Sequence, residues 1–424
     1  MLATPMLVLR LQQQVRCWKR ATSQHSLRSF GRPFSSNILL TFCCVRHECL
    51  FGPVFIGCVM VESSDRCTPV SVAIAGCGAV TRLYYAPALA ALTAAGKIEL
   101  KVAFDPDRTS AEALCSQFKA ARVADTFSDC LNGPEVLIVA SPPHFHAEQV
   151  TAALTAGLHV FCEKPLATNS SDADRMLTAA KQSKRMLGVG LIRRHLPAAR
   201  MIRDLLAADV LGRPRRVHCF EGGPMSWPVH SPAYFSRSLS GGGVLQDVGT
   251  HVLDLLTWWF GPPLAVDYED DSMGGVEANC RVVLDYSDFQ AVVRLSRDWQ
   301  QPNRWFIEGE KSWLAWNAND GRDLELGTCG GSLTLSAALK CNTSNPQRMR
   351  ASHPVHDFNA SFENQIASFI NAVHGGTHAP VPGEVGLDVV RIIDRCYANR
   401  RLMHMPWLSD AEFSQALALS ENLT

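Results

Sequence analysis

"VSVAIAGCGAVTRL", residues 70–83, places two closely spaced glycines between a short apolar run and the start of a helical pattern. A glycine turn directly after a strand and directly before a helix is the context that a dinucleotide-binding loop requires. Gly76 can make the tight turn, Gly78 lets the backbone approach a pyrophosphate, and the helix N-terminus offers amide groups and a positive dipole. Thr81 occupies the third position, where such loops have Gly or Ala, so the match is incomplete.

Downstream of this loop, short apolar runs alternate with longer helical patterns. Further strands are predicted at residues 98–104, 135–140, 158–162 and 186–192. Helices are predicted at residues 80–96, 109–120, 146–157 and 170–183. Through about residue 192 this alternation predicts an α/β domain of the Rossmann type, a parallel sheet flanked by helices.

The periodicity changes after Gly212. Residues 277–286 and 289–296 alternate apolar and polar side chains on either side of a short polar turn, which predicts an antiparallel hairpin with one buried face. Further strand-like runs lie at residues 215–222, 304–316 and 332–339. We therefore expect an α+β domain with a large, mostly antiparallel open sheet.

The remaining segments complete the expected organisation. Residues 341–359 read as one long polar loop, and residues 362–376 as a helix with an apolar stripe. That stripe contains Phe362, Ile366, Phe369 and Val373. The predicted divisions are a leader at 1–67, a dinucleotide-binding domain at 68–192 and a substrate-binding domain at 193–424.

The composition excludes several classes of partner. The 424 residues include 40 basic and 40 acidic ones, so no net field attracts nucleic acid or an anionic membrane. The apolar run at 51–61 is too short to span a bilayer. The 15 cysteines include no C-x-x-C pair, which indicates reduced packing cysteines rather than a disulfide framework or a zinc site. A small-molecule partner is therefore expected.

Residues 1–67 differ in composition from the rest of the chain. No acidic residue precedes Glu48, while arginines and lysines are spread through a background that contains serines, as in an organelle transit peptide. In the alternative interpretation the protein starts near Met60, and the preceding residues are a non-native leader. The first interpretation predicts a mitochondrial or plastid location, and the second a cytoplasmic one.

Asp105 ends the second predicted strand and supports the assignment of the glycine loop. A carboxylate at this point can hold the hydroxyl groups of the adenosine ribose. Because the same charge would repel a 2′-phosphate, NAD is favoured as the cofactor, and Arg108 nearby keeps NADP as an alternative.

Three residues carry the predicted chemistry. Lys164 ends an apolar strand between Glu163 and Pro165, and the carboxyl end of a parallel strand faces the ligand crevice. Asp247 and His251 lie four residues apart in residues 241–261, which read as a buried helix introduced by three glycines. An imidazole with a pKa near neutrality can take the proton of a hydroxyl group, and an ammonium group can stabilise the resulting alkoxide.

Structural alternatives exist for each of these residues. Lys164 could be a surface lysine. Asp247 and His251 could be two ligands of a metal, although the sequence offers no third, or they could form a helix-surface pair. Asp254 is predicted to be a structural residue of that last kind.

Further residues are candidates for contact with the substrate. Arg193 and Arg194 follow the last strand of the first domain, at the same crevice edge, and could equally be surface charges. A segment punctuated by proline and glycine could line the pocket with Trp227, His230, Tyr234 and Arg237, although for any single one of them a packing role is the favoured interpretation.

Three stretches together carry a resemblance to a known family. They are "GCGAV" at 76–80, "SPPHFHAEQVTAALTAGLHVFCEKPLA" at 141–167 and "GGGVLQDVGTHVLDLLTWWFG" at 241–261. In this order they resemble the glucose-fructose oxidoreductase, inositol dehydrogenase and MocA family of nicotinamide-dependent oxidoreductases. The resemblance runs from about Val70 to the C-terminal helices and leaves residues 1–67 unmatched.

The resemblance implies a role for each matching residue. Lys164 would contact the nicotinamide region and the reacting oxygen, Asp247 would orient the substrate hydroxyl, and His251 would be the general acid and base. The implied cofactor-binding residues are Gly76, Gly78, Ala79, Val80, Asp105, Ser141, Pro142, His146, Glu163 and Lys164. The open sheet of the family often forms oligomer contacts, so a dimer or tetramer is expected.

The resulting hypothesis is an NAD(P)-dependent oxidoreductase acting on a secondary alcohol of a sugar, cyclitol or related diol. One alternative is an NAD-using glycosidase, in which transient oxidation returns the cofactor unchanged. Another is a non-catalytic sensor that keeps the dinucleotide site.

Overall fold

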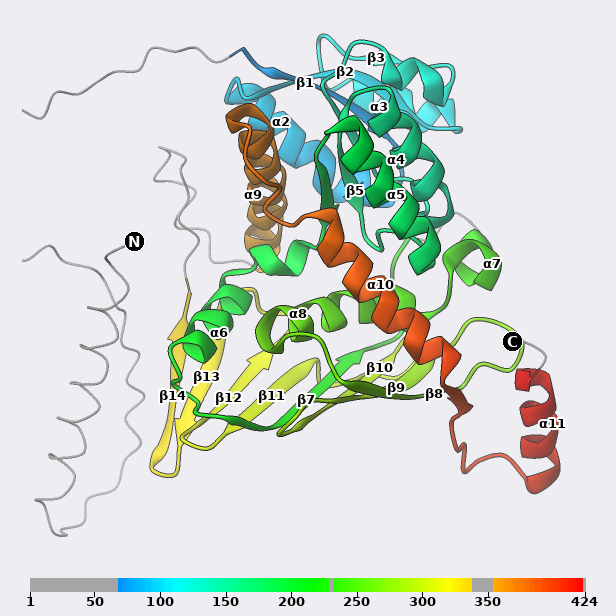
Figure 1. The fold of residues 1–424 in the computed structure, drawn as a ribbon, viewed down its shortest axis with the longest axis vertical. Coiled ribbons are helices and arrows are strands. Elements are labelled where there is room, and N and C mark those ends of the chain that lie inside the picture. Colours follow the sequence, from blue (N-terminus) through cyan, green and yellow to red (C-terminus); the bar gives the residue numbers. More distant parts are fainter. Residues whose placement is uncertain (1–67, 229–231, 338–353, 422–424) are drawn as a thin grey trace, which may run out of the picture. The chain divides into compact units, whose positions relative to one another are not determined.

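The computed structural model describes residues 68–228, 232–337 and 354–421, which form two sheets and their covering helices (Figure 1). The predicted leader, His230 and residues 341–353 of the predicted loop lie outside these ranges. No helix within the described ranges is long and apolar enough to cross a membrane.

Six parallel strands form the first sheet, in the order β3-β2-β1-β4-β5-β6. Their bounds are β1 (Val70–Ala75), β2 (Ile98–Phe104), β3 (Arg122–Val123), β4 (Val136–Val139), β5 (His159–Glu163) and β6 (Leu187–Gly190). Five of the six were predicted, and the two-residue β3 is too short to show a periodicity. This order, with β1 central, confirms the Rossmann-type sheet and brings the ends of β1, β4 and β5 to one edge.

Helices cover both faces of this sheet (Figure 1). They are the π-helix η1 (Thr81–Tyr85), α2 (Ala86–Ala94), α3 (Arg108–Cys115), η2 (Phe127–Leu131), η3 (Pro143–Phe145), α4 (His146–Thr155) and α5 (Ser170–Ser183). The helix predicted at 80–96 is therefore not regular, because one π-helical turn precedes α2. Pro87 lacks an N–H at this point, so the regular bonding pattern cannot pass through it.

Nine strands form the second sheet, in the order β14-β13-β12-β11-β7-β10-β9-β8-β15. Their bounds are β7 (Pro214–Gly222), β8 (Ala265–Asp270), β9 (Asn279–Asp285), β10 (Gln290–Ser296), β11 (Arg304–Gly309), β12 (Trp313–Asn317), β13 (Asp323–Thr328), β14 (Gly331–Ser336) and β15 (Arg400–Leu402). The sheet is mixed, since β7 pairs with β10 and β8 with β15 in parallel. The predicted hairpin is confirmed, because Leu284 faces Ala291 and Val282 faces Val293, all buried.

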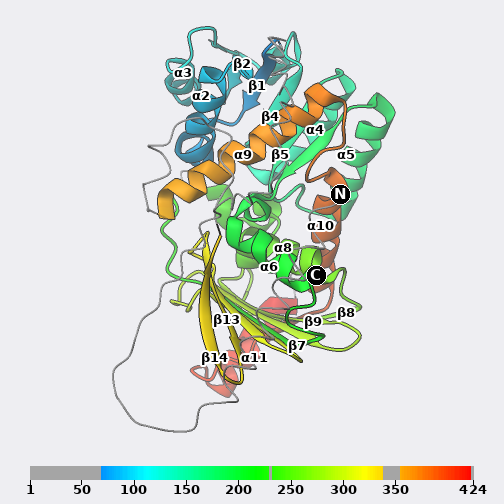
Figure 2. The same ribbon diagram turned by 90° about the vertical axis from the view of Figure 1, so that its left-hand side faces the viewer.

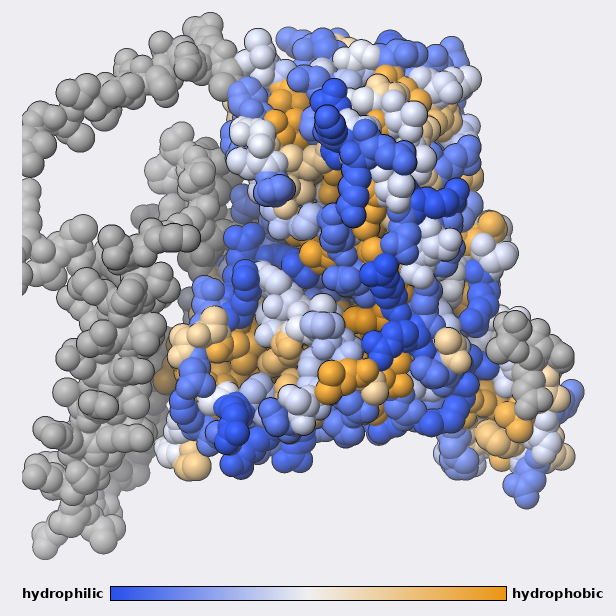
Figure 3. Space-filling model, viewed as in Figure 1, coloured by the Kyte–Doolittle hydropathy of each residue, from blue (hydrophilic) through white to orange (hydrophobic). Residues whose placement is uncertain are grey.

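Helices on one face of the second sheet bury its apolar side (Figure 2). The helical segments of this part of the chain are η4 (Ile192–His195), α6 (Pro197–Ala207), η5 (Pro232–Phe235), α7 (Arg237–Ser240), the π-helix η6 (Leu245–Gly249) and α8 (Thr250–Phe260), of which α6, η6 and α8 contribute buried residues to the core of this sheet. Ile202 of α6 and Leu253 of α8 share a core with Val282 and Val293 of the sheet. The space-filling view shows hydrophilic residues over much of one face, with separate hydrophobic patches over both the first and the second sheet and their helices (Figure 3).

Three helices follow β14 in the chain, α9 (Pro354–Gly375), α10 (Gly383–Ala398) and, after β15, α11 (Asp410–Glu421). The predicted stripe of α9 is confirmed, since Phe362, Ile366 and Phe369 are buried against Ile74 and its neighbours in the first domain. Residues 354–359 had been predicted as loop, which is wrong, because the helix already begins at Pro354. Proline is favourable in the first turn of a helix, where no N–H is needed.

Most of the described cysteines are buried packing residues, as predicted. Of the eight cysteines in the described ranges, seven are buried and none forms a disulfide, while Cys329 is exposed.

Three consecutive glycines, Gly241 to Gly243, bring the helical segment of Asp247 close to its neighbours. A Cβ at Gly243 would lie 2.0 Å from the carbonyl oxygen of Glu277, and one at Gly242 would lie 1.8 Å from the hydroxyl of Tyr397. The Glu277 carboxylate accepts hydrogen bonds from Gly243 N at 2.8 Å, Leu245 N at 3.0 Å and Tyr397 Oη at 2.9 Å. The buried carboxylate therefore accepts hydrogen bonds from amide groups at the start of this helical segment, where the helix itself supplies no acceptor.

We expect Gly243→Ala to lower Tm by about 4 °C or more, because an overlap with backbone atoms costs about 2 kcal/mol. Gly275→Ala is the matched control, since a Cβ there meets nothing within 4 Å, and its Tm should stay within about 2 °C of the parent. Thermal unfolding measures both variants. Equal Tm values for the two would contradict the close packing of this segment.

Candidate active site

Gly76 fixes the turn at the end of β1. Its φ of +98° lies in the left-handed region, and a Cβ there would lie 2.4 Å from both Ala140 C and Ser141 N. Only glycine fits both constraints, so the glycine loop lies directly against the end of β4. By contrast, a Cβ at Gly78 would meet nothing within 4 Å, which leaves that side of the loop open to a ligand.

Thr81 occupies the third position of the loop motif, where Gly or Ala is usual, and has a structural role there. Its side chain is fully buried, and its hydroxyl donates a 2.7 Å hydrogen bond to the carbonyl oxygen of Gly76. The residue at the third position thus stabilises the turn with its side chain. Ala79 and Val80 lie half-buried at the start of the same helical segment.

Asp105 lies beside the glycine loop, at the end of β2. It accepts hydrogen bonds from Cys77 N at 2.7 Å and from Asp107 N at 2.9 Å, one on each carboxylate oxygen. Each oxygen keeps a further acceptor position for a hydroxyl group. The guanidinium of Arg108 is committed to Glu112 at 2.9 Å and to Asp125 at 2.5 Å.

Glu163 is buried directly before Lys164. One carboxylate oxygen accepts from Tyr85 Oη at 2.6 Å and the other from Lys164 N at 2.8 Å. Burial raises the pKa of Glu163, while the bond from Tyr85 and the charge of Lys164 oppose that shift. Because both oxygens have partners within the protein, the geometry favours a role in positioning the Lys164 backbone over direct cofactor contact.

His146 connects the two loops that follow β4 and β5. Its ring is fully buried, with Nδ1 2.9 Å from Pro165 O and Nε2 2.9 Å from Ser141 O. Burial lowers the pKa of His146. Both ring nitrogens face backbone carbonyls, and the neutral ring donates its one N–H to one of them, so the histidine links the loop that follows β4 to the one that follows β5. Pro142 beside Ser141 is exposed.

Lys164 and Asp247 meet across the two domains. The ammonium group of Lys164 donates to Asp247 Oδ1 at 2.6 Å and approaches Asp247 O at 3.3 Å. The two side chains are 19% and 30% exposed, so the pair is partly shielded from water. An ammonium group has three N–H donors, which leaves one of them for a ligand oxygen.

The second carboxylate oxygen of Asp247 has two partners. Tyr234 Oη donates to Asp247 Oδ2, and Arg297 Nη2 lies 3.2 Å from the same oxygen and 3.0 Å from Tyr234 Oη. The Arg297 guanidinium also lies over the Tyr234 ring, 4.5 Å from its centroid. Tyr234 was predicted as a pocket residue, whereas Arg297 directly after β10 is marked by no motif and was missed.

These cations determine the charge state of Asp247. Burial alone would raise its pKa, but the charges of Lys164 and Arg297, together with the hydrogen bonds from Lys164 and Tyr234, hold the pKa well below its ordinary value. Asp247 is therefore ionised at neutral pH.

His251 lies one residue inside α8, directly after the π-helical turn that contains Asp247. Single π-helical turns are frequent at functional sites. Nδ1 of His251 is buried and has no hydrogen-bond partner. Burial and the charges of Lys164 and Arg193 hold its pKa well below 6.5, although Asp247 opposes the shift. A neutral imidazole thus lies within the field of Lys164.

Arg193 and Arg194 are adjacent in the chain but have different partners. Arg193 forms a bidentate pair with buried Glu221, at 2.7 Å for both bonds, and the charge of Arg193 acts on His251. Arg194 pairs with Asp254 at 2.7 Å and lines a separate cavity. Asp254 was expected in a helix-surface pair, but it is fully buried, and burial raises its pKa to about 6 although Arg194 opposes the shift.

The remaining candidates lie around the site. Trp227 is 39% exposed and its ring stacks on Tyr84, with centroids 6.3 Å apart. The Arg237 guanidinium lies over Tyr397, 4.8 Å from the ring centroid. Within the described ranges, no three or more histidine, cysteine, aspartate or glutamate side chains are grouped as metal ligands.

Comparison with known families agrees with this architecture. Residues 70–191 match the model described as "Oxidoreductase family, NAD-binding Rossmann fold", and residues 199–315 match the GFO/IDH/MocA C-terminal domain. The chain belongs to the Gfo/Idh/MocA family of oxidoreductases.

Individual relatives are more distant. The 1,5-anhydro-D-fructose reductase of Ensifer adhaerens is 31% identical over 199 residues, which cover 42% of this chain and 59% of that protein. The D-glucoside 3-dehydrogenase of Escherichia coli is 31% identical over 212 residues, which cover 48% of this chain and 57% of that protein. The chain thus spans somewhat more than half the length of these curated relatives.

A solved structure shows the same fold. The WlbA dehydrogenase from Bordetella pertussis, in complex with NADH and UDP-GlcNAcA, superposes with a TM-score of 0.66 at 18% identity. The match covers 78% of this chain and 95% of that one.

Proposed function

We propose that this protein is an NAD(P)-dependent oxidoreductase that transfers a hydride between the cofactor and a secondary alcohol or carbonyl group of a sugar, cyclitol or related diol. The proposal rests on the contact between Lys164 Nζ and Asp247 Oδ1, because this contact joins a lysine at the end of the parallel sheet to the carboxylate of the segment before α8. Relatives named as a sugar reductase and a glucoside dehydrogenase support the substrate class.

The residues of the first domain suit a nicotinamide dinucleotide. Gly78 leaves open space beside the loop, and the helical segment that follows offers amide groups to a pyrophosphate. Asp105 is held beside Cys77 with acceptor positions left for ribose hydroxyls. Since Arg108 is already paired with two carboxylates, its guanidinium group is not free to hold a 2′-phosphate, and we propose NAD as the preferred cofactor.

Three side chains would handle the charge that the reaction generates. When bound, the cofactor supplies the acceptor or donor of the hydride. In the direction of oxidation, His251 takes the hydroxyl proton, and its lowered pKa keeps it neutral for that task. The remaining N–H of Lys164 stabilises the negative charge that develops on the substrate oxygen. Asp247 holds Lys164 in place and orients the hydroxyl group.

A panel of sugars, inositols and diols, offered with NAD or NADP, tests the proposal. We expect net formation of NADH, seen as absorbance of the reduced nicotinamide, with at least one secondary alcohol, and a weaker signal with NADP because of Asp105. His251→Ala is the control and should lose about 100-fold or more of the turnover. Consumption of a glycoside without net NADH would favour the NAD-using glycosidase, and no turnover at all would contradict catalysis.

The pKa of His251 predicts the pH profile of the oxidation. Because the folded-state pKa lies well below 6.5, the neutral, proton-accepting form persists at pH 6.5 and is lost only at more acidic pH. Plots of log kcat/KM against pH should therefore stay flat down to pH 6.5 and fall below it. An acidic limb centred at or above pH 6.5 that disappears in His251→Ala would contradict this assignment.

A further inference from the structure

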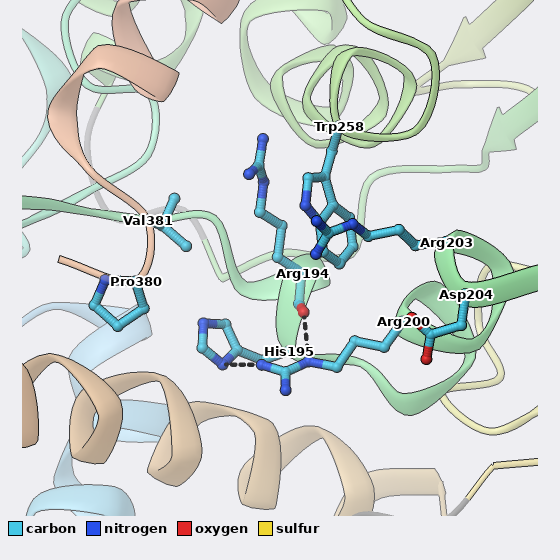
Figure 4. A pocket seen from close by; sticks show the side chains of 8 residues that line it. All are labelled: Arg194, His195, Arg200, Arg203, Asp204, Trp258, Pro380 and Val381. Atoms are coloured by element: carbon cyan, nitrogen blue, oxygen red, sulfur yellow. Dashed lines mark hydrogen bonds between the residues drawn. The ribbon is translucent and has the colours of Figure 1, made fainter. Parts of the chain in front are cut away.

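A cavity of about 340 Å³ lies at the junction of η4, α6, α8 and the segment between α9 and α10 (Figure 4). We call it the arginine pocket, after Arg194, Arg200 and Arg203, which line it together with Trp258 and Val381. Lys164, Asp247 and His251 do not line it. The proposed oxidoreductase activity therefore gives no role to this pocket.

The pocket carries more cations than its neighbouring acids neutralise. Arg194 is paired with Asp254, but Arg200 and Arg203 form no ion pair in the described part of the chain. Asp204 also lines the pocket and attracts Arg200 without forming a contact pair. Burial lowers the pKa of Arg200, Asp204 opposes that shift, and repulsion from Arg203 adds to it.

Protein contacts hold the three guanidinium groups in place. Arg200 donates to Arg194 O at 2.9 Å and lies 3.2 Å from His195 Nδ1, as Figure 4 shows. Burial and the charges of Arg200 and Arg194 lower the pKa of His195 to about 3, so its ring is neutral and can accept this bond. The guanidinium carbons of Arg194 and Arg203 lie 5.1 and 4.8 Å from the centroid of Trp258.

We propose that the arginine pocket binds a small anionic molecule through a phosphate or carboxylate group, with Arg200 and Arg203 as its recognition residues. The planar guanidinium group matches both oxyanions with paired N–H donors. The volume lies within the range of small-molecule sites and exceeds what a single inorganic ion needs. Pro380 and Val381 offer an apolar surface for the rest of such a molecule, in the same pocket as Trp258, over which Arg194 and Arg203 lie.

The pocket is separate from the proposed substrate site, because the side chains of the adjacent residues Arg193 and Arg194 contact different partners. Arg193 is committed to Glu221 and acts on His251, whereas Arg194 reaches Asp254 and Trp258. Binding here does not depend on the proposed reaction, so it is tested without measuring turnover.

Isothermal titration of the full chain with pyrophosphate, and separately with citrate, tests the proposal. NAD is present at saturation in both titrations, so that the glycine loop does not bind the probe. We expect saturable binding of at least one probe, weakened about tenfold by Arg203→Gln and by Arg200→Gln. Both side chains lie on the exposed side of α6, and an unchanged Tm verifies that the variants fold.

Arg391→Gln is the matched control, since it removes an exposed guanidinium group on α10, and it should leave the affinity unchanged. Binding of pyrophosphate alone would identify a phosphate ligand, and binding of citrate alone a carboxylate ligand. Absence of saturable binding with millimolar probe would overturn the proposal. Equal affinities in the parent and both pocket variants would overturn it as well.

Discussion

The ion pair between Lys164 and Asp247 is the interaction on which the proposed site depends. It joins the end of β5 in the first sheet to the π-helical turn that precedes α8, so each domain supplies one half. Both side chains are mostly buried, so the cost of removing their charges from water offsets much of their attraction. The value of the pair lies in geometry, because it holds an ammonium group and a carboxylate together, and a neutral imidazole lies within the field of both charges. Arg297 and Tyr234 on the second oxygen keep Asp247 ionised and prevent it from rotating away.

Buried polar residues behind this pair account for its placement. Glu163 and Tyr85 hold the backbone at Lys164, and His146 fixes the following Pro165 against the loop after β4. On the other side, Glu277 holds the N-terminal end of the segment that contains Asp247. Each of these groups would cost free energy if it were buried without a partner. Their hydrogen bonds to one another and to the backbone explain how an apolar helix and an apolar strand can present charged side chains to one another, although one oxygen of Glu277 is buried without a partner.

Much of the fold follows from local patterns, and the parts that do not have specific reasons. Alternation predicted the β9–β10 hairpin, and the glycine loop predicted the turn after β1, because each depends on neighbours in the chain. Strand β15 is three residues long and too short to show a period, whereas β13 does alternate polar and apolar residues over Asp323–Leu326 and was missed all the same. Arg297 lies fifty residues from Asp247, and only the sheet brings them together. Arg193 and Arg194 have different partners although they are adjacent in a 3₁₀ turn. No periodicity in the sequence predicts which way each side chain of such a short turn extends.

A double-mutant cycle on kcat/KM for alcohol oxidation tests the central claim most directly. The cycle compares Lys164→Met, Asp247→Asn and the double variant with the parent protein, using a substrate found in the screen. If the two residues act as one unit, removing the second costs little once the first is gone, so the double variant is about as slow as the slower single variant. Losses that simply multiply would show that Lys164 and Asp247 act independently and would contradict this account.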